Sequence, residues 1–369
     1  MKKITFFIGS LAGGGAEGVC VNVSNGLIKL GWQVDIVVLN LDKSVLVHQL
    51  DSRINIYSLN VFNARYALIP IIKYIFTQKP VTIVAFTYEL SVLLILIRRF
   101  FRLKFKVVAR NINTLSKERM QNIGFWRHKI VNPLIDNFYL KSDHVINQCI
   151  DMESDLLTIY PSLKGRTSVI YNAVNSKIES YLEGNDISHL CRDDYLLCIG
   201  RLEEQKAFHF AIEAFSYIHE DYPHLRLKLV GDGSLKSMLI NRANEFGVID
   251  KVDFEGFQAE TIHYYMHAKA TLLTSLYEGF PNVLIESISL GTPVVSFNCK
   301  SGPSEIVKSG VNGFIVEQYD VKGLASSIRT LLDNEVDRHE VLCSSLKYKN
   351  ESIIFQWHEL LCKYSTQYD

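Results

Sequence analysis

The chain has 369 residues, of which 48% are apolar, so it is long enough for two domains and too apolar to be disordered. Its formal net charge is zero, but residues 1–180 hold 22 Lys and Arg against 12 Asp and Glu, while the remainder holds 17 against 27. The seven cysteines, at 20, 149, 191, 198, 299, 343 and 362, form no C-x-x-C pair, which favours reduced thiols in a cytoplasmic protein over zinc or disulfides.

The first half alternates short apolar strands with amphipathic helices, the pattern of an α/β domain with a parallel sheet. Its start, Lys2-Lys3 before apolar Ile4–Ala12, could also be a secretory signal, but a strand that enters a glycine loop and a helix fits better. The apolar run Val81–Ile97 contains Glu89 and is too short to span a membrane, so no transmembrane segment is predicted. The predicted strands are Ile4–Ile8, Val34–Leu39, Ile54–Leu59, Thr82–Phe86, Val107–Arg110 and Val145–Asn147, and the predicted helices include Glu17–Leu30 and Ala64–Thr77.

The second half repeats this pattern after a polar stretch, Asn175–Asp194, which we interpret as a linker. We therefore predict two doubly wound domains, over residues 1–180 and 181–350, and a C-terminal helix over 351–369 that packs back toward the first domain. The apolar stripe of that helix is expected to be core. The predicted strands are Tyr195–Ile199, Leu225–Val230, Val252–Glu255, Ala270–Thr274 and Pro293–Phe297, with helices Phe208–His219, Leu235–Phe246, Val283–Leu290 and Glu351–Tyr364.

The first candidate site is the glycine-rich loop Gly9–Glu17, between the first predicted strand and the first helix. Glycines let backbone N–H groups approach a ligand closely, and a helix N-terminus favours negative charge, so a phosphate or a sugar beside one is expected. The loop has neither the Lys-Ser/Thr of a P-loop nor the spacing of a dinucleotide fingerprint. A tight strand-to-helix turn would also explain it.

Two cations, Arg201 and Lys206, follow the first strand of the second half. They would lie at the carboxyl end of a parallel strand, where open α/β sheets bind ligands. A guanidinium and an ammonium in that position can neutralise a diphosphate, although ordinary surface charge is the alternative interpretation.

The segment Ser275–Glu286 places two acids around a predicted helix start. Glu278 lies in the loop after a strand, Pro281 is expected in the first helical turn, and Glu286 lies just over one turn inside the helix. One carboxylate can hold sugar hydroxyls and the other ribose hydroxyls, with the N–H groups of Phe280–Val283 between them. Alternatively, Glu278 caps the helix dipole and Glu286 faces solvent.

Seven motifs follow one another along the chain: Gly13–Glu17, Gly200–Lys206, Leu229–Gly233, Phe254–Phe257, the Glu-x7-Glu pair Glu278 and Glu286, Gly291–Val295, and Ser301–Ile306. Their order resembles the retaining glycosyltransferases of the GT-B fold that build bacterial surface polysaccharides. The resemblance covers nearly the whole chain and is densest over residues 196–320. It implies two Rossmann-like domains that face a central cleft, with the acceptor on the side of the first domain and the nucleotide sugar mainly on the second.

The resemblance also implies roles for individual residues. Arg201 and Lys206 would hold the donor diphosphate, and Glu286 would bind the ribose hydroxyls. Glu278 would contact the transferred sugar, so Arg201, Lys206 and Glu278 are the expected catalytic residues. Further donor contacts are expected from Gly14, Gly15, Phe257, Gly279, Phe280, Pro281, Asn282 and Val283.

No metal or other cofactor is expected, because in this family side chains neutralise the diphosphate and its departing oxygen deprotonates the acceptor on the same face of the sugar. The one sequence that approaches a D-x-D metal site is Asp253-Phe254-Glu255, and it is a poor match.

Two positions depart from the family pattern. Many relatives have a His after the fifth strand of the first domain, whereas this chain reads Val108–Thr114, so Arg110 or Asn111 is expected to stand in for it on the acceptor side. Ala207 follows Lys206 where Gly is usual, and we expect this to change only local backbone freedom.

The run Arg98–Lys106 mixes cations with aromatic residues after an apolar helix. No nucleic-acid-binding signature accompanies it, so we expect contact with an anionic membrane surface rather than with nucleic acid, and a solvated loop is the alternative. The excess of basic residues in the first half fits an anionic lipid or acceptor, although ordinary surface variation would give the same pattern. We therefore expect a cytoplasmic enzyme that works at the inner face of the membrane.

The resemblance thus predicts a hexosyl- or N-acetylhexosaminyl-transferase that uses a nucleotide-diphosphate donor, with a UDP-sugar as the expected one. The expected acceptor is a glycan or lipid-linked glycan in O-antigen or capsule assembly. A nucleotide-sugar epimerase of the same fold is one alternative. A non-catalytic sugar-nucleotide-binding relative is another, but it need not retain Arg201, Lys206, Glu278 and Glu286.

Overall fold

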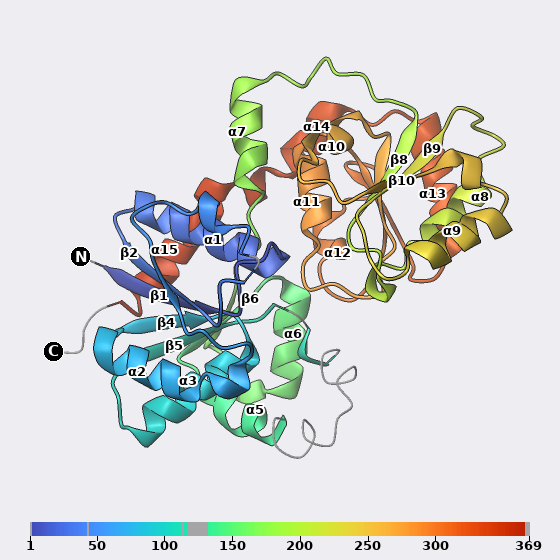
Figure 1. Cartoon of the computed structure of the whole chain (residues 1–369). Helices are drawn as coiled ribbons and strands as arrows, with labels where there is room; N and C mark the ends of the chain where they lie inside the picture. The colour runs from blue at the N-terminus through green and yellow to red at the C-terminus, as the bar shows by residue number, and fades with distance from the viewer. Residues whose placement is uncertain (1, 43, 113, 117–131, 366–369) are drawn as a thin grey trace. The chain divides into compact units, whose positions relative to one another are not determined.

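The computed structural model describes residues 2–42, 44–112, 114–116 and 132–365; Asn113, within the predicted stretch Val108–Thr114, lies outside them. The chain divides into two compact units, which are unit 1, Met1–Ala173 with Asn350–Asp369, and unit 2, Val174–Lys349 (Figure 1). The boundary expected at residue 180 falls inside helix α7 (Ser176–Gly184), whereas the division lies in front of that helix.

Unit 1 is built on a parallel sheet whose described strands run in the order β3-β2-β1-β4-β5-β6-β7. Strand β1 lies near the middle of this sheet, with Ile4 and Phe6 fully buried, so the strand interpretation of the N-terminal segment is confirmed. The strands are β1 (Lys3–Ile8), β2 (Gln33–Val38), β3 (Asn55–Ser58), β4 (Thr82–Ala85), β5 (Lys106–Arg110), β6 (His144–Asn147) and β7 (Thr167–Val169).

Helices cover both faces of this sheet: α1 and α15 lie on one face, and α2, α3 and α5 on the other (Figure 1). Helix α15 packs closely on α1, because a Cβ at Gly26 would lie 2.6 Å from Ile354. Its Trp357 is 1% exposed and meets Phe6 with ring centroids 6.2 Å apart. The described helices are α1 (Gly15–Lys29), α2 (Leu68–Gln78), α3 (Tyr88–Phe100), α5 (Asn132–Phe138), α6 (Ile150–Ile159) and α15 (Asn350–Cys362).

Unit 2 has a second parallel sheet, in the order β10-β9-β8-β11-β12-β13, with its own apolar core. Its strands are β8 (Tyr195–Ile199), β9 (Arg226–Val230), β10 (Val252–Gly256), β11 (Ala270–Leu273), β12 (Val294–Phe297) and β13 (Gly313–Val316). Its helices are α7 (Ser176–Gly184), α8 (His209–Ser216), α9 (Lys236–Glu245), α10 (Ile262–His267), α11 (Asn282–Ser289), α12 (Pro303–Ile306), α13 (Val321–Asp333) and α14 (Arg338–Ser344). Both sheets have the strand order of a doubly wound α/β fold, so the predicted fold class is confirmed.

The predicted strands agree with the observed ones to within one residue at each end, but some elements differ. The short edge strands β7 and β13 are not predicted. The predicted linker Asn175–Asp194 contains α7, and the predicted helix Ala64–Thr77 is interrupted at Ala67, which separates a 3-10 turn from α2. All seven cysteines lie in the described part of the chain, and none of them forms a disulfide.

Candidate active site

The strand order of unit 2 reverses between β8 and β11, because the chain fills one side of β8 first and then crosses to the other. Doubly wound sheets bind ligands at the carboxyl ends of the strands at such a switch point. The loop after β8 carries Arg201 and Lys206, and the loop after β11 carries Glu278. The structure therefore brings two of the predicted site segments together.

Three hydrogen bonds to backbone carbonyls join these two loops. The Leu276 backbone N–H donates to the Gln205 carbonyl at 2.9 Å, and Gln205 Nε2 donates to the Tyr277 carbonyl at 3.0 Å. Thr274 Oγ1 donates to the carbonyl of Lys206 at 3.0 Å. Because its backbone is fixed in this way, Lys206 has a defined position beside the end of β11.

Lys206 and Glu278 form an ion pair across the two loops, with Nζ 2.6 Å from Oε1. The two side chains are only 15% and 9% exposed, so each charge depends on the other for its neutralisation. The side chains predicted to hold the diphosphate and the sugar are thus in direct contact. An incoming anion would compete with Glu278 for the ammonium group.

The exposed Arg201 follows Gly200 at the end of β8, and the loop after β9 supports this turn. Gly231 has a φ of 143°, and a Cβ there would lie 1.9 Å from the Gly200 carbonyl oxygen, so only glycine permits the approach. The backbone N–H and Oγ of Ser234 both donate to Glu203, and these bonds lower the pKa of that carboxyl. Sequence reasoning did not identify Glu203 or Ser234.

Ala207, which follows Lys206, is buried and adopts a left-handed conformation with φ 47° and ψ 42°. Glycine takes this conformation without steric cost, which gives a physical reason for the usual residue in the family. The backbone of this chain keeps the turn despite the added Cβ.

Glu286, in the second turn of α11, is partly buried rather than turned to solvent. Tyr265 Oη donates to its Oε2 at 2.9 Å. Burial raises the pKa of Glu286 to about 7, and the hydrogen bond from Tyr265 opposes that rise in part. Burial and the neighbouring carboxylate raise the pKa of Tyr265 well above its usual value, so its hydroxyl stays a donor. No sequence signal marked Tyr265.

The N-terminus of α11 differs from the prediction by one position. The helix begins at Asn282, and Pro281 precedes it with a ψ of 93°, outside the helical region, so the placement of Pro281 in the first helical turn was wrong. Gly279 and Phe280 are buried, whereas Asn282 and Val283 are partly exposed. The accessible part of this helix start is therefore its first two residues.

An exposed aromatic residue follows strand β10, and the strand itself carries two paired acids. Phe257, predicted to lie by the base, is 78% exposed. Arg226 Nε donates to Asp253 at 2.7 Å, and Lys228 Nζ lies 3.7 Å from Glu255, so cations of β9 already neutralise the approximate D-x-D sequence. Within the described residues, no group of three or more His, Cys, Asp or Glu side chains is arranged to hold a metal.

In unit 1, the predicted glycine loop leads into α1, with Gly14 at the N-cap position and Gly15 as the first helical residue. Ser10 Oγ donates to Glu17 Oε1 at 3.0 Å. A Cβ at Gly14 would lie 2.3 Å from the other carboxylate oxygen of Glu17. The carboxylate of the first helical turn thus folds back beside the helix start, where an anion would otherwise be favoured.

Arg110 and Asn111, the predicted substitutes for the family His, are each 2% exposed at the end of β5. Asn111 Nδ2 donates to Asn147 Oδ1 at 2.7 Å, and Asn111 Oδ1 accepts a hydrogen bond from Tyr139. Both ends of its side-chain amide are therefore used within the protein. Arg110 Nη2 donates to Asn172 Oδ1 at 2.6 Å.

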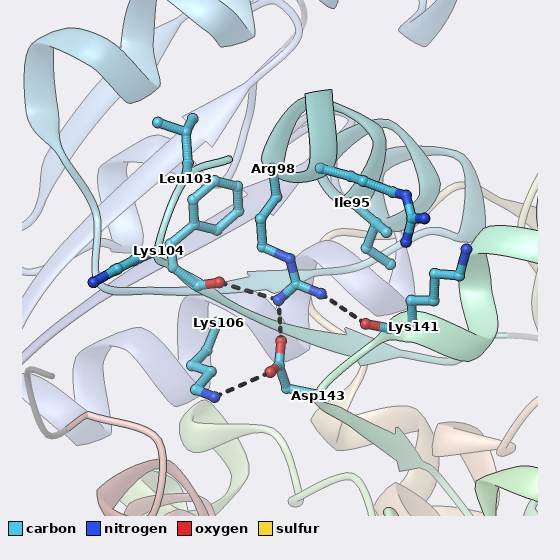
Figure 2. Close-up of a pocket in the computed structure, with 9 residues that line it drawn as sticks. Ile95, Arg98, Leu103, Lys104, Lys106, Lys141 and Asp143 are labelled. Carbon is cyan, nitrogen blue, oxygen red and sulfur yellow. Dashed lines mark hydrogen bonds and ion pairs between the residues drawn. The ribbon is translucent and has the colours of Figure 1, made fainter. Parts of the chain in front are cut away.

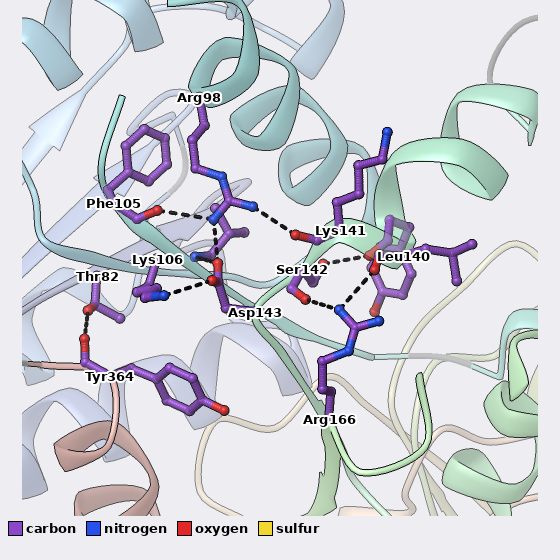
Figure 3. A network of polar contacts seen from close by, with 12 residues as sticks. Thr82, Arg98, Phe105, Lys106, Leu140, Lys141, Ser142, Asp143, Arg166 and Tyr364 are labelled. Atoms are coloured by element: carbon purple, nitrogen blue, oxygen red, sulfur yellow. Dashed lines mark hydrogen bonds and ion pairs between the residues drawn. The ribbon is translucent and has the colours of Figure 1, made fainter. Parts of the chain in front are cut away.

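The basic and aromatic run Arg98–Lys106 has an inward-facing part. Arg98 and Lys106 both pair with Asp143, and the Lys106 Nζ distance is 3.3 Å (Figures 2 and 3). Arg98 also donates to the carbonyls of Phe105 at 3.1 Å and Lys141 at 2.7 Å. These two cations therefore hold β5, α3 and the turn before β6 together.

Five other members of the run are exposed, and two of them, Arg99 and Lys104, line an open pocket of about 620 Å³ (Figure 2). Phe100 is 80% exposed and Phe101 is 39% exposed, so this part combines apolar rings with cationic side chains at the surface. The outward-facing set is Arg99, Phe100, Phe101, Arg102 and Lys104.

Solved structures with a similar fold match nearly the whole length of this chain. Alr3699/HepE of Anabaena in complex with UDP-glucose matches with a TM-score of 0.78 and 20% identity, over 98% of this chain and 100% of that one. The apo form of the lipopolysaccharide outer core galactosyltransferase WaaB matches with a TM-score of 0.75 and 18% identity, over 98% and 99%. Together with the two doubly wound units, these similarities show that the chain has the GT-B fold.

Two family models match the chain: Glycosyltransferase Family 4 over residues 13–177 and Glycosyl transferases group 1 over residues 188–345. An uncharacterized glycosyltransferase of Haemophilus influenzae is 28% identical over 98% of this chain and 100% of its own length. A 4-alpha-N-acetylgalactosaminyltransferase of Campylobacter jejuni, named for a diphospho-undecaprenol-linked acceptor, is 28% identical over 65% of this chain and 64% of its own. The chain belongs to the group 1 glycosyltransferases, and the resemblance of its motifs is confirmed.

Proposed function

We propose that this glycosyltransferase takes a sugar from a UDP-sugar and transfers it with retention of configuration. The observation that carries the proposal is the contact between Lys206 and Glu278 at the switch point of unit 2. A second carboxylate, Glu286, lies in α11, the helix that follows the loop with Glu278, and accepts a hydrogen bond from Tyr265. The similarity to a structure that contains UDP-glucose supports UDP as the nucleotide of the donor.

In this proposal Lys206 and Arg201 bind the diphosphate, and Glu286 accepts hydrogen bonds from the ribose hydroxyls. Glu278 holds the hydroxyls of the transferred sugar once the diphosphate has taken its place beside Lys206. The exposed ring of Phe257 offers a surface on which the base can stack. The cations make the diphosphate a better leaving group, because they stabilise the negative charge that develops on it.

The transfer step needs no protein base. The acceptor oxygen forms a bond to the anomeric carbon while the bond from that carbon to the diphosphate oxygen breaks. The acceptor proton moves to the departing diphosphate oxygen on the same face, so configuration is retained. We propose that Lys206 and Arg201 replace a metal ion in this step, and that the sugar is a hexose or an N-acetylhexosamine.

We propose a lipid-linked glycan of surface polysaccharide assembly as the acceptor. The Campylobacter jejuni relative is named for a diphospho-undecaprenol-linked sugar, and the structurally similar galactosyltransferase is named for lipopolysaccharide. Such acceptors lie at a membrane surface, so the enzyme has to work close to one.

A screen of nucleotide sugars tests the donor proposal. UDP-sugars are expected to raise the melting temperature of the full chain by several degrees, because a ligand that binds only the folded state stabilises it. The shift should persist in EDTA, and the donor alone should yield no epimer. The proposal would be contradicted if only nucleotide sugars other than UDP-sugars stabilised the chain, or if the shift in melting temperature disappeared in EDTA.

The surface of unit 1 supports a membrane contact through the outward-facing set. Residues 52–116 contain ten Lys and Arg and one carboxylate, Glu89. Arg98, Lys106 and Arg110 face inward, and the other seven cations lie on the surface side. Helix α2 adds an exposed apolar face, with Ile69 77% and Phe76 48% exposed, and Phe76 meets Phe101 with ring centroids 5.3 Å apart. Cations around exposed apolar side chains suit an anionic bilayer surface. Over the described ranges no helix is both long and apolar enough to cross a membrane.

Flotation with vesicles tests this contact. The full chain is expected to bind vesicles that contain phosphatidylglycerol, to bind pure phosphatidylcholine weakly, and to be released by salt. Phe100→Asp should weaken binding at least tenfold, because it places a negative charge among exposed cations and rings. Phe355→Asp is the matched control, since Phe355 is 54% exposed on α15. Equal loss in both variants would count against the proposed surface.

A further inference from the structure

Arg110 carries a buried charge that no described carboxylate neutralises. Its side chain is 2% exposed, and among the described residues neither Nε nor Nη1 has a hydrogen-bond partner. The guanidinium carbon lies 5.2 Å from the centre of the Phe86 ring, and Nη2 donates to Asn172. Within the described part of the chain, Arg110 forms no ion pair with a carboxylate. A cation–π contact and one amide compensate only part of the cost of burying the charge.

The groups around Arg110 are neutral, and they use their acceptors on one another. Asn172 Nδ2 donates to Gln148 Oε1 at 3.0 Å, and Gln148 Nε2 donates to the Asn111 carbonyl at 2.8 Å. Asn147 Nδ2, on the neighbouring strand, is also buried without a partner among the described residues. Burial raises the pKa of the nearby Cys20 thiol to about 12, so it supplies no negative charge. The carboxyl edge of this sheet therefore has three buried donor atoms that no described acceptor satisfies, which are Nε and Nη1 of Arg110 and Nδ2 of Asn147.

A purely structural arginine in this unit is arranged differently. Arg166 Nη1 donates to the carbonyls of Leu140 at 3.1 Å and Ser142 at 3.0 Å, so its charge is used to satisfy backbone groups (Figure 3). Arg110 has no such arrangement. Burial lowers the pKa of Arg110 to about 10, so it is still protonated at neutral pH. An uncompensated buried charge at a strand's carboxyl end is a feature of ligand sites.

We propose that Arg110 is a specificity-determining residue that binds the carboxylate of an acidic sugar carried by one of the two substrates. A carboxylate matches the single positive charge among neutral amides, whereas a phosphate dianion would leave a negative charge buried. The carboxylate would accept hydrogen bonds from Nε and Nη1, the two nitrogens of Arg110 that lack a described partner. The identity of the two substrates rests on the proposed function.

Two pairs of probes test this inference with the full chain. Methyl glucuronide and methyl glucoside differ by a carboxylate on an acceptor-like sugar, and UDP-glucuronate and UDP-glucose differ in the same way on the donor. The chain is expected to bind the carboxylate-bearing member of one pair at least tenfold more tightly by calorimetry at pH 7.5. The pair that discriminates tells which substrate brings the acid. Equal binding within both pairs would overturn the proposal, and this comparison needs no variant.

Variants then assign the discrimination to Arg110. Arg110→Met should reduce it to less than twofold, and Arg110→Lys should keep part of it. In the absence of any probe, Arg110→Met should raise the melting temperature by a few degrees. The reason is that an apolar side chain of similar volume replaces an unpaired buried charge. The control Arg166→Met should lower the melting temperature and keep the discrimination. Unchanged discrimination in Arg110→Met would overturn the proposal.

The inference and the proposed donor site fail separately. Undiminished UDP-glucose binding in Lys206→Ala would remove the donor site and leave the Arg110 comparison standing. Loss of carboxylate discrimination would leave UDP binding by unit 2 untouched.

Discussion

Lys206→Ala is expected to lower the rate of sugar transfer by about 10²- to 10³-fold, because the leaving diphosphate loses a cation in a partly desolvated site. Steady-state kinetics with the donor found in the screen measure this loss. Because Lys206 acts on charge that develops in the transition state, kcat should fall at least as much as the affinity for the donor. Transfer within tenfold of the unmodified chain would contradict the assignment.

The same substitution is expected to destabilise unit 2. The buried Glu278 would lose Lys206, its ion-pair partner among the described residues, which costs about 3 kcal/mol for a buried pair that is broken on one side. The double variant Lys206→Met with Glu278→Gln removes both charges, so it should recover most of this stability in chemical denaturation while it stays inactive. Recovery of activity together with stability would mean that the pair is structural.

Lys269→Ala is the matched control at the opposite end of β11. Lys269 Nζ lies 3.3 Å from Asp194, but the two side chains are 34% and 59% exposed. A surface ion pair of this kind contributes less than about 1 kcal/mol. We expect transfer within twofold of the unmodified chain, so that a large effect at Lys206 reflects its position and not the removal of a lysine.

Most of the fold could be predicted because burial on both faces leaves a direct trace in a parallel strand. Strands β8, β11 and β12 are short apolar runs between polar loops, and each was predicted to within one residue. Helix α7 left no such trace, since Ile178 is its only buried residue. The capping hydrogen bond from the Lys177 backbone N–H to Asn175, at 3.0 Å, marks its start and could have been recognised from the Asn residue.

The sequence proposed residues for the site but not the contacts between them. Strand ends indicated Lys206 and Glu278, because ligands of such sheets bind there, and Glu286 was indicated by its place inside the helix that follows. The contact between Lys206 and Glu278 joins positions 72 residues apart, and it depends on the strand order rather than on any local pattern. Tyr265 belongs to α10, a short helix that was not predicted from the sequence, so its bond to Glu286 had no sequence signal.

Glu286→Gln is expected to stabilise unit 2 above neutral pH and to weaken donor binding. The usual pKa of this carboxyl is 4.5, and burial raises it to about 7 in the folded chain. Between these values the folded state binds the extra proton, so stability falls as pH rises through this window, with a cost of up to about 3 kcal/mol at pH 8. Glutamine can still accept the hydrogen bond from Tyr265, so the melting temperature should exceed that of the unmodified chain at pH 8 and equal it near pH 4.5.

Ionisation of Glu286 should strengthen donor binding, although it lowers the stability of the folded chain. If ribose hydroxyls bind the ionised Glu286, the dissociation constant for UDP-glucose rises about tenfold between pH 8 and pH 6, because the carboxyl must first lose its proton. UDP-glucose suits the measurement because its diphosphate does not titrate in this range. Glu286→Gln should bind more weakly and lose the pH dependence, whereas Glu245→Gln, a change at an exposed carboxylate on α9, should keep both. A pH-independent dissociation constant in the unmodified chain would mean that the ionised Glu286 does not bind the ribose, so that its raised pKa has no role in donor binding.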